Sequence, residues 1–235
     1  MSTLLVIRHG QASFGQKDYD NLTPVGVEQA QLLGRWLADG GPRIDKVFVG
    51  PRRRQRDTAR HMIEASGGRI PGPALVPGFD EYPAEAIMRQ ALPRLMDVDD
   101  EAKEVFGGDP LGVPTDARRF QRVFERVMHR WVAGDPGLDL GDTESFAAFA
   151  ARCRAAYQDI VASCGRGVVV CAVTSAGPTS IACQMALELP DPVALKMSWV
   201  VANSAVTELR FRDDELTLVA FNAVPHLPRS LVTYR

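Results

Sequence analysis

Leu4-Leu5-Val6-Ile7-Arg8-His9-Gly10 is an apolar run that ends abruptly in arginine, histidine and glycine. A short apolar run bounded by glycine favours a buried β-strand, which we place at residues 3–8. Such a strand carries the side chains of Arg8 and His9 at its end, on a rigid support.

A second apolar run, residues 45–50, leads into an arginine-rich segment that opens a helical pattern over residues 52–66. Both strands are therefore expected to deliver arginine to one edge of the same sheet. Guanidinium groups bind phosphate and carboxylate oxygens, and a helix N-terminus adds unpaired N–H groups that favour an anion. The pattern predicts an anion-binding site, with phosphate as the favoured ligand.

Strand-like and helix-like segments alternate along much of the chain. An amphipathic helix is predicted over Pro24–Asp39, with Thr23 as its N-cap. The further predicted elements are a strand at 74–77, a helix at 144–164, a strand at 168–174, a helix at 176–188, and strands at 203–211 and 215–222, with Asp213 and Asp214 at a hairpin turn. This order favours an α/β fold, a three-layer α/β/α sandwich with a mostly parallel central sheet.

Residues 84–142 interrupt the alternation with helical segments and a loop rich in glycine and proline. We interpret them as a helical cap inserted into a single domain that spans residues 1–235. Five arginines between residues 118 and 130 lie opposite an apolar stripe, and a solvated face is the favoured interpretation over a substrate clamp.

Composition narrows the class of protein. The chain has 235 residues, 46% of them hydrophobic, and a formal net charge of −2. It lacks the positive field of a nucleic-acid binder, and its apolar runs are too short to span a bilayer, so neither nucleic acid nor a membrane is expected as a partner. The oligomeric state stays open, a homodimer included.

Four cysteines, Cys153, Cys164, Cys171 and Cys183, lack paired metal-ligand spacing, and no signal-peptide pattern precedes the first predicted strand. We therefore expect a cytoplasmic protein without disulfides or structural zinc.

Several short motifs together resemble those of the histidine phosphatase (phosphoglycerate mutase-like) superfamily. Arg8-His9-Gly10 matches the first motif of that family, and residues 22–30 resemble its Leu-Thr-x-x-Gly-x-x-Gln-Ala. Residues 50–59 resemble its Ser-Pro-x-x-Arg-x-x-Gln-Thr-Ala. The matches occur in order from residue 4 to residue 227, so the resemblance covers nearly the whole chain.

The resemblance implies roles for individual residues. His9 corresponds to the nucleophile that forms a phosphohistidine, and Arg8 and Arg54 correspond to ligands of the phosphoryl oxygens. Glu81 falls where the family has its proton donor, with Asp80 as the alternative. The implied chemistry needs no cofactor and no metal.

Three polar residues in the neighbouring loop, Gln11, Ser13 and Thr23, are candidate substrate-binding residues. Their amide and hydroxyl groups suit contacts with phosphate or with the rest of the substrate. Local hydrogen bonding within the loop is the alternative role.

The main departure from the family lies after the predicted strand 168–174. Ser175 stands where the family generally has a second histidine. A serine hydroxyl can bind phosphate, but it lacks the charge and the proton-transfer capacity of an imidazole. His61, His129 and His226 are the remaining histidines, and none is chosen as a replacement; a structural role is favoured for His226.

The leading hypothesis is a phosphatase that hydrolyses a small phosphate monoester through phospho-His9, and a serine in place of the second histidine is expected to weaken it. A noncatalytic phosphate sensor or interaction module is the alternative from another class. A phosphoglycerate mutase-type phosphotransferase is the closest enzymatic alternative, although segments specific to mutases are not recognised. The substrate beyond its phosphate is not identified.

Overall fold

The computed structural model describes residues 1–13, 20–106, 116–213 and 215–234. Contacts within the chain divide it into two compact units. Residues 1–81 and 152–235 form the first unit, and residues 82–151 form the second. The first unit contains the sheet and every residue for which a catalytic or binding role is predicted.

Six strands in the described residues form one sheet. They are β1 (Ser2–Arg8), β2 (Lys46–Val49), β3 (Pro73–Leu75), β4 (Val169–Thr174), β5 (Val206–Arg212) and β6 (Glu215–Ala223). The order across the sheet is β3-β2-β4-β1-β5-β6. β1 to β4 run parallel, whereas β5 runs antiparallel to both of its neighbours. The predicted mostly parallel sheet is confirmed.

The helices of the first unit are α1 (Pro24–Asp39), α2 (Arg53–Ala65), α6 (Phe146–Ala162, whose first residues belong to the second unit), α7 (Ala176–Leu187) and α8 (Asp191–Ser198). Thr23 caps α1 as predicted, since its hydroxyl accepts a hydrogen bond from the backbone N–H of Gly26. The sequence analysis did not predict α8. Asp213 has a left-handed φ of 56°, while Asp214 lies outside the described residues.

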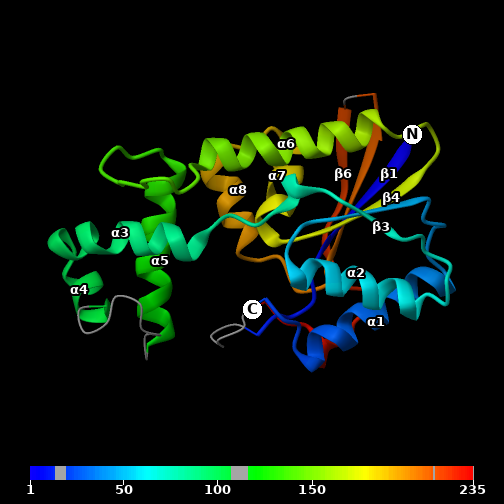
Figure 1. Ribbon diagram of the computed structural model, residues 1–235, viewed down its shortest axis with the longest axis horizontal. Helices are drawn as coiled ribbons and strands as arrows, with labels where there is room; N and C mark the ends of the chain where they lie inside the picture. Colours follow the sequence, from blue (N-terminus) through cyan, green and yellow to red (C-terminus); the bar gives the residue numbers. More distant parts are fainter. Residues whose placement is uncertain (14–19, 107–115, 214, 235) are drawn as a thin grey trace. The chain divides into compact units, whose positions relative to one another are not determined.

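Helices cover both faces of the sheet (Figure 1). Leu5 and Ile7 of β1 pack with Leu33 of α1 and Met62 of α2. Leu4 and Val6, which point the other way, pack in a second cluster with Tyr157 and Ile160 of α6 and Ala182 of α7. Alternate residues of one strand thus enter two cores, as the pleat of a strand requires. The three-layer arrangement is confirmed.

The second unit is helical and has its own core. It comprises α3 (Ala84–Val98), α4 (Asp100–Phe106), α5 (Ala117–Val132) and the start of α6. Val123, Val127 and Trp131 of α5 are buried, and the Trp131 ring packs edge-on against Phe146. The predicted insertion, residues 84–142, lies within this unit. Its role as a cap stays a prediction.

The arginines of α5 make ion pairs within the second unit. Arg119 pairs with Glu104, Arg122 with Glu101, and Arg126 with both Asp99 and Glu101. These three arginines are partly exposed, as the interpretation of a solvated helix face expects. Their guanidinium groups pair with carboxylates of α4 and of the residue just before it. Among the described helices, none combines the length and apolarity needed to cross a bilayer.

Close contact between α1 and α2 depends on Gly34. A Cβ atom added at Gly34 would lie 2.1 Å from the carbonyl oxygen of Met62 on α2. That oxygen belongs to helix backbone and cannot move alone. The two helices would therefore have to separate to accept a larger residue.

We predict that Gly34→Ala lowers the free energy of unfolding by about 1–3 kcal/mol, the usual cost of overpacking a core. The better helix propensity of alanine, about 1 kcal/mol, only partly offsets this cost. Urea unfolding measures the change. The control is Gly40→Ala at the end of α1, where an added Cβ has nothing within 4 Å. Equal stability of the two variants would contradict the prediction.

His226 is a buried structural histidine of the first unit. Its Nε2 lies 2.9 Å from the Ser204 hydroxyl, and its Nδ1 has no hydrogen-bond partner among the described residues. Burial lowers the pKa of His226 to about 4. The folded state therefore disfavours protonation of this ring.

We predict that the native protein loses stability as the pH falls from 6.5 to about 4. In that window the unfolded chain takes up a proton at His226 that the folded chain does not. The difference between the two pKa values corresponds to a decrease of at most about 3 kcal/mol in the free energy of unfolding. His226→Gln should remove this part of the acid sensitivity. The check is urea unfolding from pH 7.5 to 4.5, with each protein referenced to its own value at pH 7.5; parallel curves would refute the prediction.

Candidate functional site

The candidate site lies at the carboxyl ends of β1, β2 and β4. His9 follows β1, the start of α2 follows β2, and Ser175 follows β4. The backbone N–H of His9 donates to the carbonyl of Thr174 at 2.8 Å, which joins the ends of β1 and β4. This edge is where ligands bind in open α/β sheets.

Both ring nitrogens of His9 are held by hydrogen-bonding groups. Nδ1 lies 2.7 Å from the Gly10 carbonyl, and Arg54 Nε donates to Nε2 at 3.0 Å. A carbonyl accepts only, so Nδ1 carries the proton and Nε2 keeps its lone pair. This tautomer suits nucleophilic attack through Nε2.

The charge state of His9 also suits a nucleophile. The imidazole is buried, with 3% of its surface exposed. Burial, followed by the positive charges of Arg54 and Arg8, holds the pKa of His9 well below its ordinary value of 6.5. The ring is therefore neutral at neutral pH.

Arg54, in the first turn of α2, is a cation that hydrogen-bonds directly to the candidate nucleophile His9. Its side chain is 4% exposed, and its Nη1 pairs with the carboxylate of Asp20 at 2.8 Å. Thr58, one turn later, accepts a hydrogen bond from Gly10 N at 3.0 Å and donates to Arg54 O. α2 thus fixes both the loop after His9 and the guanidinium.

Arg8 bonds to backbone carbonyls near the C-terminus. Its Nη1 donates to Val201 O and, at 2.9 Å, to Tyr234 O. Arg8 still contributes to the electrostatic field at His9. Its role as a phosphate ligand stays a prediction.

The glycines of two sequence motifs meet beside His9. A Cβ added at Gly10 would lie 2.4 Å from Gly26 O, and one added at Gly26 would lie 2.1 Å from Gln11 O. The loop after His9 therefore packs directly on the first turn of α1. This contact gives a physical reason for glycine in both motifs.

Ser175 is fully buried, and its hydroxyl accepts a hydrogen bond from Gln55 Nε2 at 2.8 Å. The Gln55 amide also donates to Phe79 O at 3.0 Å, while its oxygen accepts from Arg52 N at 2.9 Å. Gln55 therefore joins the start of α2, the loop before Glu81 and the end of β4. Phosphate binding by Ser175 stays a prediction.

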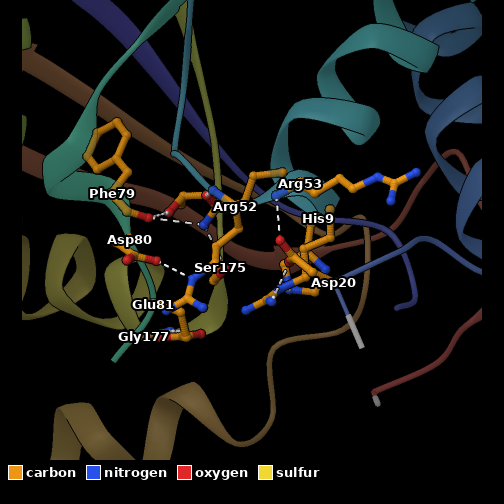
Figure 2. A network of polar contacts seen from close by, with 12 residues as sticks. His9, Asp20, Arg52, Arg53, Phe79, Asp80, Glu81, Ser175 and Gly177 are labelled. Carbon is orange, nitrogen blue, oxygen red and sulfur yellow. Dashed lines mark hydrogen bonds and ion pairs between the residues drawn. The ribbon is translucent and has the colours of Figure 1, made fainter. Parts of the chain in front are cut away.

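Glu81 lies at the N-terminus of α7. The backbone N–H of Gly177 donates to both of its carboxylate oxygens, each at 3.2 Å. Figure 2 shows Glu81 beside Gly177. Asp80 instead forms an ion pair with Arg52. The two candidate acids therefore have different described partners, the Gly177 N–H for Glu81 and the Arg52 guanidinium for Asp80.

The candidate substrate-binding residues make local hydrogen bonds. Thr23 Oγ1 donates to Gln11 Oε1 at 2.9 Å while it caps α1, and Ser13 N donates to Asn21 O at 2.9 Å. These contacts match the local role that the sequence analysis gave as an alternative. Contacts with a substrate stay a prediction.

The remaining histidines have other surroundings. His61 of α2 lies 3.3 Å from the Glu64 carboxylate, His226 binds Ser204, and His129 belongs to α5 of the second unit. The structural role favoured for His226 agrees with its burial.

Sequence reasoning missed Asp20 and Gln55. Gln55 stands three residues after Arg52, the position from which a side chain reaches back to a helix N-cap, so a signal was present. Asp20 carries no comparable signal, because a carboxylate in a loop has no periodic pattern to mark it.

The chain matches the sequence pattern of a known protein family over most of its length. The model of the histidine phosphatase superfamily (branch 1) matches residues 4–83 and 82–224. A 2,3-bisphosphoglycerate-dependent phosphoglycerate mutase of Methylorubrum populi is 34% identical over 74 residues, 28% of this chain and 35% of that protein. The matched region thus spans about a third of the length of such curated relatives.

Solved structures show the same fold over nearly the whole chain. A mutant phosphoserine phosphatase of Entamoeba histolytica, in complex with phosphoserine, has a TM-score of 0.65 at 19% identity and covers 97% of this chain and 100% of its own. A phosphoglycerate mutase of Bacillus anthracis has a TM-score of 0.66 at 19% identity, with 96% and 94% covered. A mycobacterial glucosyl-3-phosphoglycerate phosphatase has a TM-score of 0.63 at 22% identity, with 94% and 98% covered.

The motifs around His9 and Arg54, the sheet order and the family match over most of the chain agree. The chain belongs to the histidine phosphatase superfamily.

Proposed function

We propose that this chain is a phosphatase that hydrolyses a small phosphate monoester through phospho-His9. The observation that carries the proposal is the neutral, oriented imidazole of His9, with Nδ1 bound to a carbonyl and Nε2 facing the Arg54 guanidinium. Superfamily membership and the phosphatases and mutases among its structural relatives support a phosphoryl-transfer enzyme.

In the first step, His9 Nε2 attacks phosphorus, the P–O ester bond breaks, and the leaving alkoxide takes a proton from the Glu81 carboxylic acid. In the second step, Glu81 takes a proton from water, the water oxygen attacks phosphorus, and the P–N bond breaks. Orthophosphate leaves, and His9 returns to its neutral form. Arg54 offsets negative charge on the phosphoryl oxygens in both steps.

A noncatalytic phosphate-binding module is the second candidate. Ser175 favours it, because its buried hydroxyl replaces an imidazole and is engaged with Gln55. Phosphate binding without turnover of any ester would distinguish this module from an enzyme.

We predict that His9→Ala abolishes phosphate release from phosphomonoesters while the protein stays folded, since the variant lacks the Nε2 lone pair that lies beside Arg54. The measurement is phosphate release from a panel of esters in chelator-containing buffer, for wild type and variant. Circular dichroism checks folding. Equal turnover by both proteins would refute the proposed nucleophile.

We predict that Glu81→Gln slows alkyl phosphates about 10²- to 10³-fold, within the usual range for loss of a general acid. An aryl phosphate such as p-nitrophenyl phosphate should slow much less, because its leaving group needs little protonation. The control is Asp80→Asn. If Asp80→Asn shows the leaving-group dependence and Glu81→Gln does not, Asp80 is the proton donor.

A further inference from the structure

The carboxylate of Asp20 binds donors beside the nucleophile with both of its oxygens. Oδ1 accepts from Arg54 Nη1 at 2.8 Å, and Oδ2 accepts from the backbone N–H of Arg53 at 2.7 Å. Figure 2 shows Asp20 next to His9 and Arg53. One carboxylate thus bridges a guanidinium and the first N–H of α2.

These donors are the ones that an incoming phosphate needs. A phosphorus atom in position for attack must lie about 3–3.5 Å from His9 Nε2. Arg54 Nε already donates to that nitrogen. The Arg54 side chain is 4% exposed, and its Nη1 binds the Asp20 carboxylate. The phosphoryl oxygens and the Asp20 carboxylate therefore compete for one cation.

We infer that Asp20 is an internal competitor for the phosphate position and thereby sets the affinity of the site for phosphate. The inference rests on the proposed function, because it takes the donors around His9 as the phosphate site. The Asp20 side chain is 35% exposed, so its ion pair is weak enough to be displaced. A phosphate dianion brings a larger negative charge to the same guanidinium and helix N-terminus.

The test is isothermal titration of orthophosphate into wild type and Asp20→Asn at pH 7.5 and constant ionic strength. The asparagine oxygen can still accept the Arg53 N–H bond, whereas the competing negative charge is gone. We expect the Kd for orthophosphate to fall about three- to fivefold, the upper part of the range that loss of a partly exposed ion pair implies.

The matched control is Asp57→Asn. Asp57 belongs to α2, the helix whose first turn Asp20 binds, and it pairs with Arg53 Nε at 3.5 Å and Arg60 Nη2 at 3.3 Å. Asp57→Asn removes the same amount of charge near that helix without touching the Arg54 ion pair. We therefore expect the Kd to change less than about twofold, because salt screens the longer-range effect of an exposed charge. Urea unfolding verifies that both variants fold.

Weaker or unchanged phosphate binding by Asp20→Asn would overturn the inference and make Asp20 a residue that positions Arg54. An equal gain in both variants would also overturn it, because the cause would be the overall charge. Orthophosphate is not a substrate for hydrolysis, so these results are independent of turnover. Tighter binding by Asp20→Asn without ester hydrolysis by wild type would refute the hydrolytic function and leave the inference standing.

Discussion

The buried hydrogen bond from Arg54 to His9 constrains the rest of the site. A guanidinium 3.0 Å from an imidazole nitrogen, both out of water, requires the imidazole to stay neutral. The Arg54 donor then requires the lone pair on Nε2, and the Gly10 carbonyl accepts the proton of Nδ1. The same constraint leaves Arg54 with a charge that needs a negative partner, which Asp20 provides in this structure. Nucleophile, cation and anion thus form one electrostatic unit.

The sequence predicted the parts of this unit that lie at the ends of regular elements. The apolar runs of β1, β2 and β4 and the capped helix α1 carry strong periodic or positional signals. The roles predicted for His9, Arg54 and Ser175, which come after those strands, rest on the resemblance to the family's motifs. The partners of those residues could not be predicted in the same way. Asp20 lies in a loop, and Arg8 bonds to carbonyls 193 and 226 residues away along the chain, where only the folded backbone defines the contact.

Ser175 lies in a polar network that joins α2, β4 and the loop before Glu81. Gln55 joins the start of α2 to Phe79 O and to Ser175, and the Thr174 hydroxyl also donates to Phe79 O at 2.9 Å. Two donors on one carbonyl fix the loop that leads to Glu81. The Ser175 hydroxyl thus belongs to a buried polar network, and hydrogen-bonded buried networks hold a unique geometry. An imidazole there would have to displace this network.

The contact between Gly10 and Gly26 limits how this site can change over evolutionary time. Each glycine leaves room for the backbone of the other segment, so a side chain at either position pushes on a carbonyl that has nowhere to move. The loop after the nucleophile and the first turn of α1 therefore cannot drift separately. Substitutions of side chains around this junction can change which substrates fit, whereas the path of the backbone through the junction stays the same.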